Sequence, residues 1–420
     1  MPAFAQNRLF CAALACLAAI GSAHAAKSYG PGVSDTEIKI GQTMPYSGPL
    51  SAYGTIGKAQ AAYFEKINAE GGINGRKIKL ISLDDGFNPA KTVEQTRKLI
   101  EEQQVLLLFS SLGTVTSNAV RKEVNAKKVP QIFLLSGATQ WDDPQGYPWS
   151  MGWVPAYQME AKAYARYVLQ ARPNAKIAVL YQNDDHGKDY LKGFRDGLGA
   201  QAKRIVSEVS YAASDPTVDS QVVMLQASGA DVFMNFATAK AAAQAIRKAH
   251  DIGWKPLQLL TLTSSSVEAV LKPAGIDRAL GIVSASFIKD PADPQWNNDA
   301  AMQEWRAWMK RYYPEGNSAD MMNVVGYSMA QTLVQVLRQC GGDLTRENVM
   351  RQAASLHNLE LPMLLPGMRI DTAPNDFAPV EQVQLVRFDG ARWVRFGELY
   401  AGSATASATA QSSQIDPSAR

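Results

Sequence analysis

The sequence IKIGQTMPYSGPLSAYGTIGKAQAAYFEKINAEGGINGRKIKLISLDD, from Ile38 to Asp85, predicts a strand, a loop, a helix, a turn and a second strand. Ser47-Gly48-Pro49 ends the first strand, because glycine and proline interrupt regular structure. Apolar residues at spacings of three and four from Ile56 to Ile67 predict an amphipathic helix, which Gly71-Gly72 ends. The apolar run from Ile78 to Leu83 predicts a strand covered on both faces, as in a parallel sheet.

Such a βαβ unit places the loop after its first strand at the carboxyl edge of the sheet, where open α/β sheets bind ligands. Strands and helices alternate again through residues 88–139 and 158–262, which predicts parallel sheets with right-handed crossovers. Helices are expected at residues 296–313 and 320–339. From Gly367 the period changes to two, and Asp389-Gly390 predicts a hairpin turn.

The composition indicates a globular protein with more than one core. The chain has 420 residues, of which 46% are hydrophobic and 19% charged, so two lobes are expected. The formal charge is +3, and loss of a leader that contains Arg8 leaves 3 − 1 = +2. This balance argues against a nucleic acid or an anionic membrane as a partner.

The first 25 residues have the pattern of a cleavable signal peptide. Arg8 precedes an apolar run from Leu9 to Ile20 that is too short to span a bilayer, and Ala23-His24-Ala25 is a cleavage pattern. An uncleaved anchor, or a lipoprotein attached through Cys16, fits this pattern less well. We therefore expect an exported, periplasmic protein in which Cys340 is the lone cysteine, without a disulfide or a Cys₄ metal site within one chain.

Five motifs resemble the type I periplasmic solute-binding proteins, and within them the Leu/Ile/Val-binding family that serves ABC importers. They are Tyr46-Ser47-Gly48-Pro49, Tyr53-Gly54, the run from Gly71 to Gly75, Asp84-Asp85 and the run from Tyr181 to Gly187. The resemblance covers nearly all of residues 37–400. It implies two α/β lobes, each a mostly parallel sheet flanked by helices, joined by three crossovers and closing on a small ligand that a membrane permease then receives.

The expected organisation follows from this resemblance and from the order of the predicted elements. The signal peptide is expected at 1–25, the first lobe at 36–154 and 284–362, the second lobe at 155–283 and 363–400, and a disordered tail at 401–420.

Two loops of small residues favour a site for an acid group. Gly113-Thr114 and Gly137-Ala138-Thr139 each follow a predicted strand. Unpaired backbone amides at helix N-termini carry partial positive charge and bind a carboxylate without any Arg or Lys. Short loops of an α/β sheet need small residues for packing alone, but two loops at corresponding positions favour a site.

The resemblance assigns further ligand contacts residue by residue. Tyr53 falls at the aromatic that covers the ligand, Gly113 at a carboxylate-binding serine, and Gly137 and Thr139 at a backbone and hydroxyl pair. The positions expected to bind ligand are Tyr53, Gly113, Thr114, Gly137, Ala138, Thr139, His186, Thr238 and Thr263.

The sequence departs from the family at Thr263, where the family has the acidic residue that binds the ligand's ammonium group. A buried ammonium without an anionic partner costs several kcal/mol, more than a hydroxyl returns. His186 also replaces the family's Tyr or Phe, and Phe87 and Leu112 stand at the positions of its disulfide. An apolar or flat carboxylate is therefore an alternative ligand, with possible cleft-lining residues Trp141, Trp153, Tyr157, Phe236 and Met322.

These observations favour the binding component of an ABC importer, with a branched-chain amino acid as the ligand that the family implies. We expect a monomer whose partners are a small carboxylate and the permease, with no cofactor and no metal, since His186 has no second histidine nearby. A sensor that signals to a membrane receptor stays open. An enzyme is less favoured, because no G-x-G-x-x-G, P-loop or G-x-S-x-G motif is present.

Overall fold

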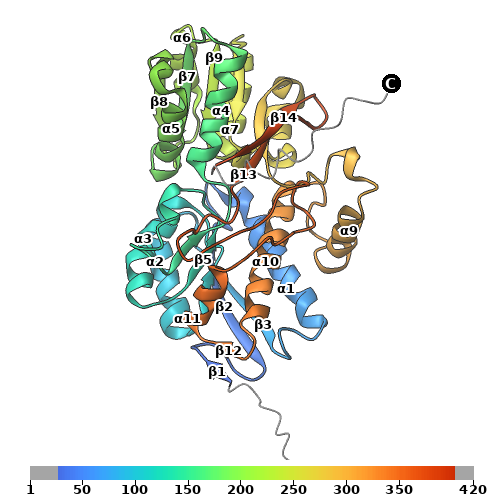
Figure 1. Cartoon of the computed structure of the whole chain (residues 1–420). Coiled ribbons are helices and arrows are strands. Elements are labelled where there is room, and N and C mark those ends of the chain that lie inside the picture. Colours follow the sequence, from blue (N-terminus) through green and yellow to red (C-terminus); the bar gives the residue numbers. More distant parts are fainter. Residues whose placement is uncertain (1–26, 403–420) are drawn as a thin grey trace, which may run out of the picture.

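The computed structural model describes residues 27–402, and the expected signal peptide and residues 403–420 of the expected tail lie outside them. Two sheets, one above the other in Figure 1, each form the centre of a lobe. Within residues 27–402, no helix is long and apolar enough to cross a membrane.

The first lobe is built on a five-stranded parallel sheet with the order β3-β2-β4-β5-β6. The strands are β2 (Glu37–Met44), β3 (Lys77–Asp84), β4 (Leu107–Phe109), β5 (Gln131–Leu134) and β6 (Ser150–Gly152). The helices are α1 (Gly54–Ala69), α2 (Pro89–Arg97), α3 (Thr114–Ala126), α9 (Ala300–Tyr312), α10 (Met321–Gln339) and α11 (Arg346–Ala353). A short parallel pair joins β1 (Ser28–Tyr29) to β12 (Asp343–Leu344).

The second lobe is built on a seven-stranded sheet with the order β14-β13-β11-β10-β9-β7-β8. Its strands are β7 (Ile177–Gln182), β8 (Ile205–Tyr211), β9 (Val232–Phe236), β10 (Leu257–Leu260), β11 (Val283–Ser286), β13 (Gln382–Phe388) and β14 (Trp393–Ala401). Only β13 and β14 run antiparallel to their neighbours, and they form the expected hairpin. The helices are α4 (Tyr157–Ala171), α5 (Asp185–Leu198), α6 (Asp219–Ala227), α7 (Ala239–Asp251) and α8 (Lys272–Ala274).

The predicted βαβ unit at residues 38–85 is present as β2, α1 and β3, but one expectation about it is wrong. β3 is not covered on both faces: it pairs only with β2 at the edge of the sheet, and Lys77 and Lys79 are exposed. Asp84 at the end of β3 holds the loop after β2, because its carboxylate accepts hydrogen bonds from the amides of Tyr46 (2.9 Å) and Ser47 (3.1 Å). This loop leads directly into Tyr53 and α1.

Three other boundaries differ from the predicted ones. Ser284–Ser286, expected in the first lobe, continue β11 in the sheet of the second lobe. The helix expected from Trp296 begins at Ala300, because the Asp299 side chain caps it through the amide of Met302. Ala401, expected in the tail, is the last residue of β14.

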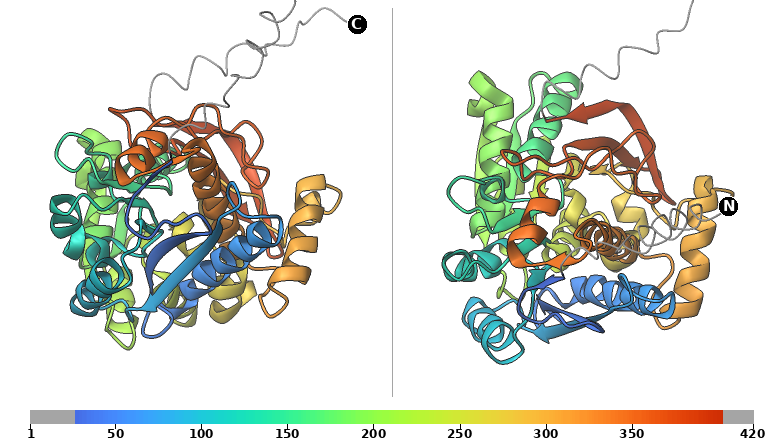
Figure 2. Two further views of the ribbon diagram at one scale, coloured as in Figure 1. Left: turned by 90° about the horizontal axis from the view of Figure 1, so that it is seen from below. Right: turned by 60° about the horizontal axis from the view of Figure 1, so that its bottom comes forward.

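Helix α9 lies at the rim of the molecule in both views of Figure 2. Its aromatic residues form part of the core rather than a surface: Trp305 and Trp308 are buried, and the ring of Trp308 lies 6.3 Å from that of Tyr63 on α1. Helices α1 and α10 pack side by side, and the loops at their N-terminal ends reach toward the second lobe.

Candidate functional site

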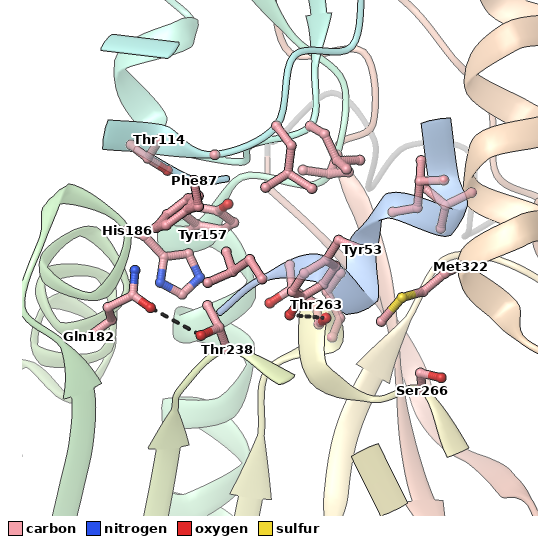
Figure 3. A pocket seen from close by; sticks show the side chains of 18 of the residues that line it. Tyr53, Phe87, Thr114, Tyr157, Gln182, His186, Thr238, Thr263, Ser266 and Met322 are labelled. Carbon is pink, nitrogen blue, oxygen red and sulfur yellow. Dashed lines mark hydrogen bonds between the residues drawn. The ribbon is translucent and has the colours of Figure 1, made fainter. Parts of the chain in front are cut away.

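A pocket between the two lobes is built from loops that follow the strands of both sheets (Figure 3). It holds about 780 Å³ of empty space, part of which is open to solvent. The first lobe contributes residues from the start of α1 and the start of α3, and the second lobe contributes the loops after β7, β9 and β10.

Most of the lining is apolar. The carbon-rich side chains come from both lobes and surround the centre of the pocket: Leu50, Ile56, Phe87, Leu112, Leu135, Val154, Leu262, Phe287, Met321, Met322 and Val325. Among the described residues that line this pocket, none is Asp, Glu, Lys or Arg. A ligand body bound here therefore lies against hydrocarbon and meets no formal charge.

The N-terminus of α3 is the polar end of the pocket. Gly113 is the N-cap with φ +100°, and among the described residues no side chain caps this helix. The first bond within the helix runs from the Ser117 amide to the Gly113 carbonyl (3.2 Å), so the amides of the first turn have no partner inside the helix. They are the donors that an acid group bound in this pocket would meet.

Glycine is required at position 113 for two reasons. Its φ lies in the left-handed region, and a Cβ there would stand 2.6 Å from both Phe87 Cε2 and Thr116 Oγ1. The serine that the family has at this position would not fit against Phe87. The Thr114 hydroxyl beside it is buried and lies 2.7 Å from Ser136 Oγ, so it stabilises the loop as well as lining the pocket.

Tyr53 crosses from the first lobe to the second. Its hydroxyl accepts a hydrogen bond from the Ala239 amide at the start of α7 (3.0 Å) and donates one to the Thr263 carbonyl (3.1 Å; Figure 3). Burial raises the pKa of Tyr53, so the phenol stays protonated at neutral pH. Tyr53 therefore links the lobes directly, and its hydroxyl accepts the hydrogen bond of the N-terminal amide of α7.

His186 and Tyr157 form an aromatic wall on the other side of the pocket (Figure 3). Their ring centroids lie 4.9 Å apart, and Tyr157 stacks on Tyr190 at 4.3 Å. Burial lowers the pKa of His186, which keeps the imidazole neutral, and its Nδ1 has no hydrogen-bond partner among the described residues. Thr238 lies nearby and donates to Gln182 Oε1 (3.1 Å).

Two carboxylates lie directly behind the lining. Asp320 accepts a hydrogen bond from the Ser266 hydroxyl (2.9 Å), and Glu160 accepts one from the Leu262 amide (2.8 Å). Burial raises the pKa of both groups, that of Glu160 to about 7. Both are bound to the chain itself and neither lines the pocket.

The structure brings together most of the residues singled out in the sequence, but not all of them. The predicted residues that line the pocket are Tyr53, Gly113, Thr114, His186, Thr238 and Thr263, together with Tyr157 and Met322. A second cavity, which we call the side cavity, is lined instead by Gly137, Ala138, Thr139 and Trp141. It also borders Phe377–Glu381.

The ring of Tyr157 is the reason for this separation. It packs against Gly137, where an added Cβ would stand 2.8 Å from the ring carbons Cδ1 and Cε1. The loop 137–139 therefore lies on the side-cavity face of Tyr157.

Trp153 and Phe236 lie in the core behind the lining. Trp153 is buried, packs against Phe287 and donates to the Thr332 hydroxyl (3.0 Å), whereas Phe236 stacks on Tyr190. Sequence reasoning missed Gln182, Ser266 and the role of Phe87 as lining residues. The sequence marked Phe87 only as standing at a disulfide position of the family, and Gln182 only as part of the run from Tyr181 to Gly187.

Comparisons with known proteins agree with this geometry. Residues 37–392 match a family described as "Periplasmic binding protein". "Leu/Ile/Val-binding protein homolog 7" of Brucella abortus is 25% identical over 55% of this chain, and the chain spans 60% of the length of that relative.

Two solved structures share the fold. A branched chain amino acid ABC transporter structure from Thermus thermophilus with bound valine has a TM-score of 0.80 at 16% identity, over 90% of this chain and 99% of that one. A fatty acid ABC transporter substrate-binding protein from Thermomonospora curvata has a TM-score of 0.74 at 21% identity, over 91% and 96% of the two chains. These likenesses confirm the two-lobed α/β fold expected from the sequence.

Proposed function

Because this chain belongs to the family of periplasmic binding proteins, as its match over residues 37–392 establishes, we propose that it captures a small carboxylate between its lobes for an ABC importer. The ligand would be bound by the closed lobes and delivered to the membrane permease. A cleaved signal peptide would take the protein to the periplasm.

We further propose that the ligand is an aliphatic or aromatic acid without an amino group. The observation that carries this proposal is the absence of Asp, Glu, Lys and Arg from the described residues that line the pocket. The first-turn amides of α3 supply donors for a carboxylate, but an ammonium group would be buried against apolar side chains without an anion, at a cost of several kcal/mol. Thr263 supplies only a hydroxyl where an ammonium would need a carboxylate.

The carboxylates behind the lining do not change this conclusion. Asp320 and Glu160 already accept hydrogen bonds from Ser266 and Leu262, and reaching them would require a ligand to displace these lining residues. The solved structures with this fold include one with bound valine and one of a fatty acid transporter substrate-binding protein, so the fold occurs with either ligand class.

Two pairs of compounds that differ only in the amino group test the proposal. After removal of bound ligand with denaturant and refolding, 4-methylpentanoate is compared with leucine and 3-methylbutanoate with valine by isothermal titration calorimetry, with phenylacetate as the aromatic acid. We expect the amine-free member of each pair to bind at least about 100-fold more tightly, equivalent to about 2.7 kcal/mol. Tighter binding of leucine and valine would overturn the ligand class. If none of the compounds binds with a dissociation constant below the millimolar range, the proposed function is overturned.

A single substitution makes the test sharper. Thr263→Glu places a carboxylate at the position of the family's acidic residue, and we expect it to raise the affinity for leucine and lower that for 4-methylpentanoate. Thr263→Gln, which adds a side chain of the same length at the same lining position without the charge, is the matched control.

A further inference from the structure

The loop 137–139, which has the small residues and the threonine of an acid-binding loop, already holds a carboxylate of this chain. The Thr139 amide and the Thr139 hydroxyl both donate to Asp189 Oδ2, at 2.8 and 3.0 Å. The other oxygen, Oδ1, accepts a hydrogen bond from Gln158 Nε2 at 2.6 Å. Both oxygens of Asp189 are therefore paired, as those of a bound ligand acid would be.

This contact crosses the cleft. Thr139 follows β5 of the first lobe, whereas Asp189 lies on α5 and Gln158 on α4 of the second lobe. A longer bond between the lobes runs from Asn118 Nδ2 on α3 to Asp185 Oδ2 on α5, at 3.3 Å. The two bonds from Thr139 therefore join the lobes, whereas the bond from Gln158 lies within the second lobe.

We propose that Asp189 takes the place of a ligand acid group in the loop 137–139 and positions the two lobes for capture. This inference rests on the proposed function. If Asp189 fills the loop 137–139, the N-terminus of α3 is the one place left for the acid group of the ligand. Asp189 is a positioning residue: it does not line the pocket, and it acts on the ligand through closure of the lobes.

The consequence for specificity is that one acid group, not two, is accommodated between the lobes. The loop 137–139 lies behind the Tyr157 ring and is filled by Asp189, so the far end of a ligand meets the apolar lining and the neutral His186. A dicarboxylate would leave its second charge unpaired there, whereas a monocarboxylate with an apolar body would not.

Asp189→Ala tests the proposal against a matched control on the same helix. Asp196→Ala removes a carboxylate of α5 that pairs with Lys192 inside the second lobe (2.6 Å). With 4-methylpentanoate or phenylacetate as the probe, we expect Asp189→Ala to lower affinity about tenfold, because charge-assisted bonds across the cleft are lost. Asp196→Ala should bind as the wild type does.

Chemical rescue separates positioning from a general loss of charge. Formate can enter the vacated position in Asp189→Ala and accept the two hydrogen bonds of Thr139, so formate at tens of millimolar should restore affinity severalfold. In the wild type, formate should only compete with the probe and leave its affinity unchanged or weaker. Equal effects of formate and chloride on Asp189→Ala, or wild-type affinity of that variant, would overturn the proposal.

Small-angle scattering without any ligand keeps the two proposals distinguishable. We expect ligand-free Asp189→Ala to have a larger radius of gyration than the ligand-free wild type and Asp196→Ala. If the wild type binds no acid, the proposed function fails while this comparison still tests Asp189, and equal radii would overturn its role. Asp189→Asn, which keeps the shape of the side chain and one acceptor oxygen, is expected to lie between the two and serves if Asp189→Ala does not fold.

Discussion

Two loops of the first lobe share one sequence pattern but have different surroundings. The loop Gly113-Thr114 follows β4, opens α3 and lines the pocket, whereas the loop Gly137-Ala138-Thr139 follows β5 and binds the Asp189 carboxylate. Each follows a strand of the same parallel sheet and offers backbone donors at the same edge, but α3 follows the first loop and only a short 3-10 helix, Thr139–Trp141, follows the second.

The difference between the loops arises from the other lobe. Tyr157 and Asp189, both contributed by the second lobe, contact the loop 137–139, whereas the described residues that line the pocket beside α3 are apolar or neutral. Whether a small-residue loop binds a ligand therefore depends on which side chains approach it from the opposite lobe.

The largest expected effect concerns Glu160, which supports the wall between the two loops. Its carboxylate accepts hydrogen bonds from Tyr164 and Tyr190, each at 2.6 Å, and Tyr190 stacks on Tyr157. Burial raises the pKa of Glu160 from its ordinary 4.5 to about 7, so the folded state binds a proton that the unfolded state releases. The stabilisation by this proton is present below pH 4.5 and is lost as the pH rises through 7.

We therefore expect the wild type to lose roughly 2 to 3 kcal/mol of unfolding free energy from this group between pH 5 and pH 8. Glu160→Gln should remove that slope, measured by urea unfolding at each pH. Asp290, whose pKa burial also raises to about 7, is unchanged in both proteins, so the difference between them isolates Glu160. Parallel pH profiles for the two proteins would contradict this assignment.

The next effect concerns the loop Gly113-Thr114, which lines the pocket and which we call the open loop. Gly113→Ala forces an L side chain to φ +100° and against Phe87, and we expect it to cost about 2 kcal/mol of stability and to weaken acid binding further. Gly229→Ala is the matched control, because Gly229 also has positive φ (+70°) but a Cβ there meets nothing within 4 Å. Thermal unfolding and calorimetry measure the two effects, and equal losses for both variants would mean that crowding by Phe87 is unimportant.

Local sequence patterns were sufficient to predict the elements that form the cleft. The spacing from Ile56 to Ile67 and the breaks at Ser47–Pro49 and Gly71-Gly72 predicted β2, α1 and β3, because each signal depends on neighbours in the sequence. The same signals do not say which strand lies at the edge of a sheet. β3 was therefore expected to be covered on both faces, although it is an edge strand in which Lys77 and Lys79 are exposed.

The site was only partly predictable, because its polar groups are defined by contacts between distant residues. Tyr53, Gly113 and His186 were found through a family resemblance, and they line the pocket. Asp189 gave no signal: an acidic residue on an amphipathic helix is normally solvated, and its partner Thr139 is 50 residues away. Contacts across a cleft cannot be read from local periodicity.

A smaller effect is expected for Tyr53, which links the first lobe to α7 of the second lobe. Tyr53→Phe leaves the Ala239 amide and the Thr263 carbonyl without their partner, and we expect about 1 kcal/mol weaker acid binding, or about fivefold. Tyr46→Phe is the control, because the Tyr46 hydroxyl pairs with Ser82 inside the first lobe (2.7 Å). If both variants lower affinity equally, Tyr53 acts within its own lobe and not across the cleft.

The smallest effect should come from the Thr139 hydroxyl, in the loop 137–139 that binds Asp189. Thr139→Val removes the 3.0 Å bond to Asp189 but keeps the 2.8 Å bond from the amide, so we expect only about a twofold loss of affinity in calorimetry. Thr114→Val, its counterpart in the open loop, removes a buried hydroxyl paired with Ser136 and should instead lower the unfolding temperature. If Thr139→Val costs as much as Asp189→Ala, the amide contributes nothing, and the loop would hold Asp189 through its side chain alone. The explanation that backbone amides bind an acid group at the loop 137–139 would then be wrong.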